Sequence, residues 1–206
     1  MKTYTLTPES FLSRQERTQL LKTCREHAEL DLMKGRITWP VRYMLVDLAL
    51  FSGLRVAEIA SLNIADIYLN GESYIIVRCG KGSKVRTVYI DDSLSKHLKQ
   101  FISYKQKTLG QSINPSDPLF SGRDNSNIVV NALQKSFKTA CRAAALRSDL
   151  HIHSCRHSYA TFLLQGCNNL RYVQKQLGHS DISMTSLYAD ILPESNCLLA
   201  NSISRD

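Results

Sequence analysis

Three short motifs near the C-terminal end organise this sequence: His153-Ser154-Cys155-Arg156-His157, Leu177-Gly178-His179-Ser180 and Leu187-Tyr188-Ala189. His153 and Arg156 stand three residues apart, so one turn of a helix brings their side chains together. His179 follows a Leu-Gly pair, where a helix is expected to end and the chain to change direction. Tyr188 comes nine residues after His179. Two imidazoles, a guanidinium and a phenol in one positively charged pocket would suit a phosphate that the phenol attacks.

The length and composition favour a single globular domain. The 206 residues are 43% hydrophobic and 21% charged, which is enough apolar material for a substantial core. The first residues are polar and unlike a signal peptide, and no apolar run reaches the about 18–20 residues of a membrane span. The six cysteines are scattered, with no Cys-x-x-Cys pair. These features predict a reduced, cytoplasmic protein with free thiols and no membrane partner.

The positive charge is concentrated in the body of the chain. The net charge is +8 and the isoelectric point is about 9.2, a balance that is frequent among nucleic-acid binders. Between residues 78 and 107 the acidic residues Asp91 and Asp92 are outnumbered by eight basic ones: Arg78, Lys81, Lys84, Arg86, Lys96, Lys99, Lys105 and Lys107. A solvated helix face would account for the later lysines, whereas the first ones flank a glycine-containing turn.

Hydrophobic periodicity and turn signals predict a mainly α-helical α+β fold with a small antiparallel three-stranded sheet. Helices are expected over residues 7–28, 38–51, 93–107, 129–146, 154–165, 170–177, 180–191 and 195–203, with a further one starting at 56. Strands are expected over 74–78 and 85–90, joined by a hairpin turn with Lys81 between two glycines, and residues 119–120 are expected to add a third. Arg55 falls at a junction of two helices, where an arginine is usually either a salt-bridged structural residue or an anion ligand.

A zinc site is an alternative interpretation of the cluster His151, His153, Cys155 and His157. Alternate positions on a helix point in different directions, and no second cysteine pair lies nearby. His153 and His157 also lack the intervening glutamate of the metalloprotease motif. The pattern therefore favours a site without metal. A Cys–His hydrolase is less favoured still, because nothing marks Cys155 as exposed or activated.

The chain resembles the tyrosine recombinase family of lambda-type integrases and Xer-like proteins. The resemblance extends over about residues 5–192 and is carried by five stretches in family order: residues 52–59, 80–86, 153–161, 177–181 and 187–188. Each stretch alone would be weak, but the order and spacing together are specific. The resemblance implies a site-specific DNA recombinase or integrase of the tyrosine recombinase catalytic fold. Such an enzyme breaks and rejoins strands through a 3′-phosphotyrosyl intermediate without metal, cofactor or ATP.

The resemblance also implies a role for each site residue, with Glu58 in support of six catalytic residues: Arg55, Lys81, His153, Arg156, His179 and Tyr188. Tyr188 would attack a backbone phosphate, and the two arginines would stabilise the charge that develops on it. His153 is the candidate base, and Lys81 is the candidate acid for the departing 5′-oxygen. His179 would hydrogen-bond the phosphate.

Phosphate contacts away from the reacting group are expected from Lys84, Arg86 and the helix after residue 93, which would set affinity and register. The partners implied are a double-stranded DNA recombination site and further copies of the chain, as a dimer or tetramer on DNA. Two other functions are open at this point. One is a type IB topoisomerase, and the other is a DNA-binding regulator that has lost catalysis.

We expect residues 1–206 to form one catalytic domain without a separate N-terminal core-binding domain, because the chain begins where that catalytic domain usually begins. It is then either an excised fragment or a short recombinase of the fimbrial-switch type. Pro193 separates an apolar tail, residues 193–206, from the tyrosine segment. Family members often dock this element onto a neighbouring protomer, and we expect the same of this tail.

Overall fold

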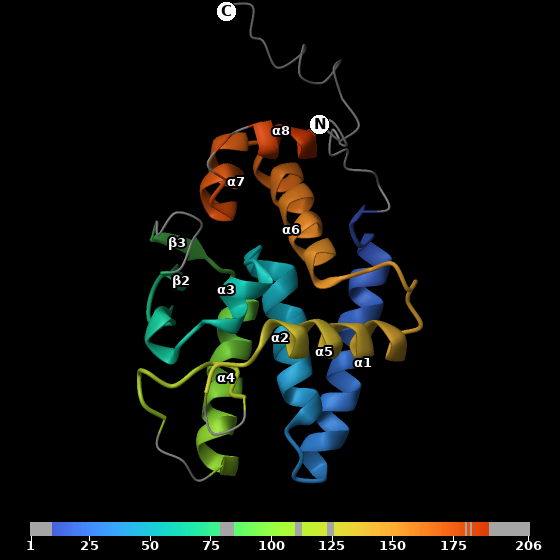
Figure 1. The fold of residues 1–206 in the computed structure, drawn as a ribbon, viewed down its shortest axis with the longest axis vertical. Coiled ribbons are helices and arrows are strands. Elements are labelled where there is room, and N and C mark those ends of the chain that lie inside the picture. The colour runs from blue at the N-terminus through green and yellow to red at the C-terminus, as the bar shows by residue number, and fades with distance from the viewer. Residues whose placement is uncertain are drawn as a thin grey trace, which may run out of the picture.

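Helices form most of the computed structural model, which describes residues 10–78, 85–109, 113–122, 126–179, 181 and 183–189 (Figure 1). The helices are α1 (Arg14–Met33), α2 (Thr38–Ser52), α3 (Val56–Ala60), η2 (Ile64–Asp66, a 3₁₀ turn), α4 (Asp92–Leu109), α5 (Val130–Ala143), α6 (Ile152–Cys167), α7 (Leu170–Leu177) and α8 (Ser183–Ala189). The strands are β1 (Ile67–Tyr68), β2 (Tyr74–Val77) and β3 (Arg86–Tyr89). This content confirms the expected mainly helical α+β fold with a small sheet. No helix in the described ranges is long and apolar enough to cross a membrane.

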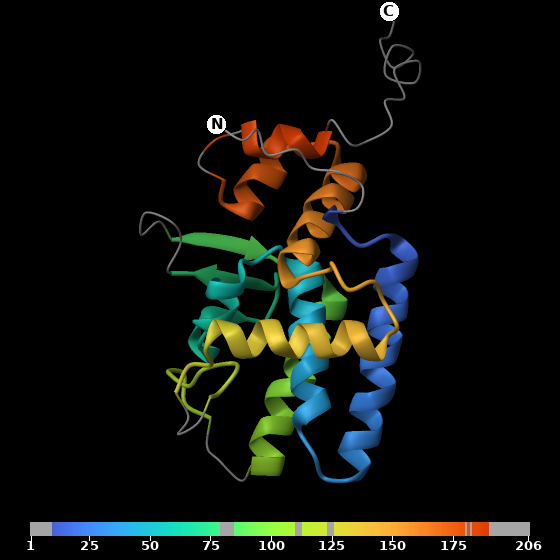
Figure 2. The same ribbon diagram turned by 45° about the vertical axis from the view of Figure 1, so that its right-hand side comes forward.

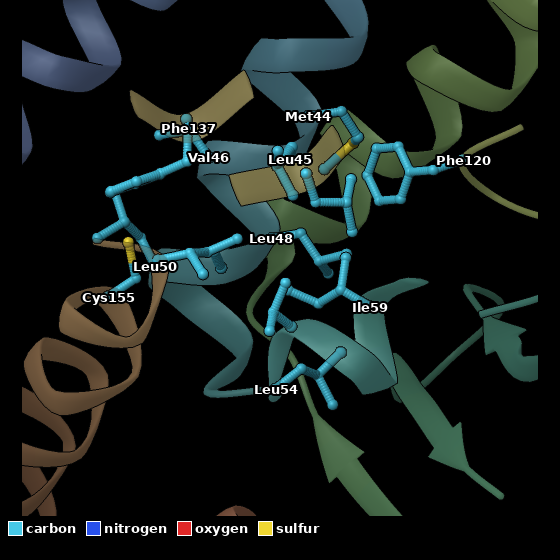
Figure 3. Close-up of a cluster of buried hydrophobic side chains, with 14 of the residues drawn as sticks. Met44, Leu45, Val46, Leu48, Leu50, Leu54, Ile59, Phe120, Phe137 and Cys155 are labelled. Carbon is cyan, nitrogen blue, oxygen red and sulfur yellow. The ribbon is translucent and has the colours of Figure 1, made fainter. Parts of the chain in front are cut away.

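Helix α2 is the centre of the main core. Its residues Met44, Leu45, Val46, Leu48 and Leu50 are fully buried, and the helix contacts α1, α4, α5 and α6. Figure 3 shows these side chains together with residues from α3, α5 and α6. Burying each large apolar side chain contributes about 1.5–3 kcal/mol. The apolar composition of residues 38–51 had predicted a helix buried on most sides, and this prediction is confirmed.

Helix α1 starts later than the sequence had indicated. Ser13 caps it, because the Ser13 hydroxyl accepts from the backbone N–H of Glu16 while the Glu16 carboxylate accepts from the N–H of Ser13. The expected start at residue 7 lies outside the described residues. The helix continues to Met33, beyond the expected end at residue 28, and the chain turns at Gly35 in a left-handed conformation (φ +66°).

The antiparallel sheet has the order β1-β2-β3, with Ile67 opposite Ile75 and Val77 opposite Arg86. The β2–β3 hairpin and the total of three strands match the expectation for the described residues, but the third strand is β1 and not residues 119–120. Leu119 and Phe120 are buried in the core, and the Leu119 N–H donates to the carbonyl of Leu62 at 2.8 Å. A two-residue apolar run can fill a core without pairing as a strand, so its composition was ambiguous.

The helices α6, α7 and α8 pack together at one end of the molecule, opposite the end at which α1 connects to α2 (Figure 2). They share a second, smaller apolar cluster: Ala160, Leu164, Val173, Leu177 and Tyr188. Helix α6 continues through Gly166, where the sequence had predicted a break, and ends at Asn168 in a left-handed conformation. Helix α7 has the predicted bounds. The expected tail helix 195–203 lies outside the described residues.

Candidate active site

Arg55 lies at the start of α3, where α2 has ended in the left-handed Gly53 (φ +64°). Its side chain is 30% exposed, so its guanidinium can reach solvent or a ligand. Nη1 donates to Glu58 Oε1 at 2.9 Å, and the backbone N–H of Arg55 donates to Glu58 Oε2 at 2.8 Å. One helical turn thus fixes Arg55 against Glu58, as the spacing of the two residues had indicated.

Glu58 holds a second arginine besides Arg55. Arg86 donates to Glu58 through Nη1 and Nη2, both at 2.8 Å, in a bidentate pair. Burial opposes ionisation of this carboxyl, but the hydrogen bonds from Arg86 and Arg55 outweigh burial and lower the pKa of Glu58 to about 2. Glu58 is therefore ionised and links α3 to strand β3, and its support of the active site stays a prediction.

Arg86 is used differently from the expectation that it would contact DNA phosphates. Only 13% of its side chain is exposed. Besides its pair with Glu58, its Nε donates to the carbonyl of Gln176 at 3.2 Å. A Cβ atom at Gly178 would lie 2.7 Å from Arg86 Cδ, so the absence of a side chain there leaves room for the arginine. This geometry makes Arg86 a link from β3 to α3 and α7, a role that local sequence could not reveal.

Arg156 is buried and is held by two backbone carbonyls at helix C-termini. Nη1 donates to the carbonyl of Gly53 at 2.6 Å, after α2, and Nη2 donates to that of Leu177 at 2.7 Å, in α7. Cations are favoured at these negative ends of the helix dipoles. Burial lowers the pKa of Arg156 to about 10, and the charge of Arg55 contributes to the lowering. The side chain stays charged at neutral pH.

Tyr188 is 3% exposed and lies between two histidines. Its hydroxyl is 3.0 Å from Nδ1 of His157. Its ring is nearly parallel to that of His179, with an interplanar angle of 12° and centroids 6.4 Å apart. His179 Nδ1 is in turn 2.9 Å from the Thr185 hydroxyl. The sequence motifs had indicated that Tyr188 and His179 would meet, and they do.

His153 is exposed and stands one turn before Arg156 on α6. Partial burial lowers its pKa, and the nearby charges of His151, Arg156 and Arg55 lower it further. Both predicted arginines therefore lie close enough to His153 to affect its protonation. The residue expected to act as base thus lies within the cationic site.

His157 contacts Tyr188 directly but was not among the site residues predicted from the sequence. It was considered only as a metal ligand, although it directly follows Arg156 and stands one turn after His153. That i, i+4 spacing was the available signal that both imidazoles lie on one face of α6.

The cysteine of the histidine cluster points away from this face. Cys155 is fully buried in the main core (Figure 3), and burial raises the pKa of its thiol well above the ordinary value. Cys155 is therefore separated from His153, which is exposed on the same helix. Among the described residues, no group of three or more His, Cys, Asp or Glu side chains is placed to hold a metal ion.

Two predicted residues, Lys81 and Lys84, stand in the sequence between β2 and β3, outside the described residues. Of the basic residues on α4, Lys105 is buried, and its ammonium donates to the carbonyls of Pro118 and Leu119 at 3.1 and 3.0 Å. Lys105 therefore ties α4 to the segment before α5, and it does not lie on the solvated or DNA-facing helix surface considered for the lysines after residue 93.

Positive charge exceeds negative charge among the charged residues described above. Burial and the neighbouring arginines lower the pKa of His179 to about 4, so this residue is neutral at neutral pH. The guanidinium groups of Arg55, Arg86 and Arg156 then face one carboxylate, Glu58, which leaves two positive charges unbalanced among these four residues. An anion bound beside Tyr188 would relieve this repulsion.

Comparison with known proteins identifies the family. The model of the phage integrase family matches residues 10–195. The tyrosine recombinase XerD of Oceanobacillus iheyensis is 35% identical over 148 residues, which cover 71% of this chain and 49% of the relative. The tyrosine recombinase XerC of Neisseria gonorrhoeae is 36% identical over 169 residues, which cover 81% of this chain and 47% of the relative. The chain belongs to the phage integrase family, and it spans about half the length of these relatives.

Solved structures support the fold independently. XerH recombinase bound to its difH substrate in a pre-cleavage complex superimposes with a TM-score of 0.77 at 24% identity, covering 100% of this chain and 56% of that chain. A lambda integrase dimer bound to a COC′ core site gives a TM-score of 0.62 at 19% identity, covering 88% and 48%. The fold is therefore that of a tyrosine recombinase catalytic domain, as the motif resemblance had implied.

Proposed function

We propose that this chain is the catalytic part of a site-specific DNA recombinase that cuts and rejoins strands through Tyr188. The observation that carries the proposal is the cluster of positive charge close to Tyr188, in which Arg55 and Arg156 are paired with a single carboxylate, Glu58. A phosphodiester is the anion that two guanidinium groups and a phenol are suited to bind and transfer. The relatives named tyrosine recombinases make DNA the favoured source of that phosphodiester.

In the proposed reaction the Tyr188 oxygen bonds to phosphorus, and the bond from phosphorus to the 5′-oxygen breaks. The product is a 3′-phosphotyrosine ester and a 5′-hydroxyl. Arg156, fixed by two carbonyls, and Arg55, fixed by Glu58, are pre-oriented to stabilise the added negative charge. His179 is the proposed hydrogen-bond partner of a phosphate oxygen, and Lys81 remains the proposed acid for the 5′-oxygen. The ester conserves the bond energy, so a second 5′-hydroxyl can rejoin the strand without ATP.

Covalent trapping tests the proposal. Genomic duplex fragments would be incubated with the chain and with Tyr188→Phe, denatured and resolved by electrophoresis. We expect a covalent protein–DNA product with the unchanged chain and none with Tyr188→Phe, which should still bind DNA. Sequencing of the trapped DNA would give the recognised site. An adduct that persists in Tyr188→Phe would mean that another residue is the nucleophile, and no adduct in either chain would favour a DNA-binding regulator.

Supercoiled plasmids separate recombinase from topoisomerase activity. A recombinase should exchange strands only between plasmids that carry the recovered site, whereas a type IB topoisomerase would relax plasmids of any sequence. We further propose that copies of this chain assemble on the DNA, with the tail 193–206 docked on a neighbour, in the cytoplasm where DNA and free thiols coexist. Relaxation of a plasmid without the site would contradict the recombinase assignment.

A further inference from the structure

The contact between His157 and Tyr188 joins the proposed nucleophile to a histidine that has no established role here. His157 projects from α6 and Tyr188 from α8, 31 residues later, and their Nδ1 and hydroxyl oxygen are 3.0 Å apart. That distance suits a hydrogen bond with the phenol as donor. The two rings are tilted by 42° with centroids 6.0 Å apart, so the contact is made through the edge of the imidazole.

The protonation state of His157 is set by its surroundings. Burial lowers its pKa to about 4, and the positive charges of His151, His153 and Arg156 on the same helix add to the effect. From the other elements it faces Tyr188 on α8 and His179 after α7. The imidazole is therefore neutral at neutral pH. A neutral imidazole carries one N–H and one free nitrogen lone pair, which makes it a possible proton acceptor.

We propose that His157 is the residue that accepts the proton of Tyr188 when the phenol attacks DNA. This inference rests on the proposed function. In the step, the phenol O–H bond breaks, the proton moves to Nδ1 of His157, and the phenol oxygen bonds to phosphorus. The bond from phosphorus to the 5′-oxygen breaks, and that oxygen takes a proton from the acid. On rejoining, the imidazolium returns its proton to the leaving phenol oxygen.

Binding of DNA would itself increase the basicity of His157. The positive charges around this imidazole disfavour a further proton, and a phosphate held by Arg55 and Arg156 would neutralise part of that field. A nearby negative charge favours the imidazolium and so raises the pKa of the histidine. His157 would thus become an effective base only when substrate is present. His157 would then take the role of base that the sequence had assigned to His153, which is exposed one turn before Arg156.

Cleavage kinetics with His157→Gln test the inference. Glutamine can still accept a hydrogen bond from Tyr188 but cannot take up its proton. The substrate would be a nicked duplex of the trapped site with sulfur in place of the bridging 5′-oxygen, because a thiolate leaves without an acid and the rate then reports on activation of the phenol. We expect cleavage at pH 7 to fall by about 10²–10⁴-fold, and to recover as the pH rises toward 9 because hydroxide replaces the base. DNA binding should be unchanged.

The control is His151→Asn, an equivalent loss of an imidazole at the exposed start of α6. Asparagine keeps an acceptor for the Ser154 N–H that His151 now caps, so cleavage at pH 7 should stay close to that of the unchanged chain. Loss of the His151 charge would raise the pKa of His157 and would not remove the base. A His157→Gln pH profile that matches that of the unchanged chain, or a faster cleavage, would overturn the inference. If the unchanged chain forms no adduct on any DNA, the proposed function fails instead.

Nitrogen-15 NMR of the unaltered chain gives an independent measurement without DNA. The proposed step requires Nδ1 of His157 to be unprotonated and to accept from Tyr188, with the proton on Nε2. At pH 7 we expect Nδ1 of His157 to have the chemical shift of an unprotonated nitrogen. In Tyr188→Phe the two ring nitrogens should have chemical shifts that indicate a mixture of both tautomers. A protonated Nδ1 that donates to the phenol oxygen would overturn the inference whatever the His157→Gln variant does.

Discussion

Replacing Arg86 with methionine should destabilise the fold strongly, although the arginine was expected to face DNA. The change removes the bidentate partner of Glu58 and leaves a buried carboxylate with Arg55 alone. A carboxyl whose pKa falls from 4.5 to about 2 on folding stabilises the folded state by about 3 kcal/mol when it is ionised, since one pKa unit is worth about 1.4 kcal/mol. Loss of one partner of a buried ion pair costs about 3–5 kcal/mol. We therefore expect Arg86→Met to lower the free energy of unfolding by about 3 kcal/mol at pH 7.

The assay is urea denaturation followed by far-ultraviolet circular dichroism, with Arg78→Met as the control. Arg78 also pairs with an aspartate, Asp66, but 57% of its side chain is exposed, compared with 13% for Arg86. The effect of Arg78→Met should be smaller than that of Arg86→Met, because solvent screens the exposed guanidinium of Arg78, although Asp66 itself is buried. Unfolding free energies of Arg86→Met and Arg78→Met that agree within about 0.5 kcal/mol would refute the reasoning.

The pH dependence supplies a second check. The pKa of Glu58 is lower in the folded than in the unfolded chain, so its contribution to stability is present above pH 4.5 and is lost as the pH falls toward 2. In Arg86→Met the pKa of Glu58 rises, and this contribution shrinks. The difference in stability between the two chains should be largest at pH 7 and should narrow below about pH 4. If the difference in stability between the two chains does not change with pH, the loss in Arg86→Met comes from packing and not from the charge of Glu58.

Two further predictions concern Gly53 and the hairpin lysines. Gly53→Ala should be destabilising and should impair cleavage, because a Cβ would lie 2.4 Å from the Tyr159 ring and the Gly53 carbonyl holds Arg156. Gly35 has a similar φ of +66°, but a Cβ there would have nothing within 4 Å. Gly35→Ala should therefore lower stability only by the backbone strain of about 1–2 kcal/mol. Equal losses of stability and cleavage in Gly53→Ala and Gly35→Ala would contradict this reasoning. Lys81→Ala should fail on ordinary DNA but cleave the sulfur-substituted DNA, whereas Lys84→Ala should show only weaker, salt-sensitive binding on both substrates. Sulfur rescue of Lys84→Ala instead would place the acid on Lys84.

The sequence by itself determined the local elements and the order of the site motifs. Helix α7 has its predicted bounds because Asn169 caps its start and the left-handed Gly178 ends it. The buried helix α2 followed from its apolar composition. The pairing of Arg55 with Glu58 followed from their spacing of one helical turn. These features depend on residues close together in the chain, so periodicity and capping rules were sufficient to predict them.

The tertiary structure alone decided which distant groups meet. Arg86 reaches Glu58 across 28 positions and His157 reaches Tyr188 across 31, and neither pairing leaves a periodic trace in the sequence. The third strand was misplaced for the same reason, since pairing of Ile67 with Ile75 depends on how the chain returns over the core and not on apolar content. A guanidinium beside a hairpin turn has the same local signature whether it faces DNA or a buried carboxylate. Only packing of β3 against α7 distinguishes the two, because it removes Arg86 from solvent and brings it to Glu58.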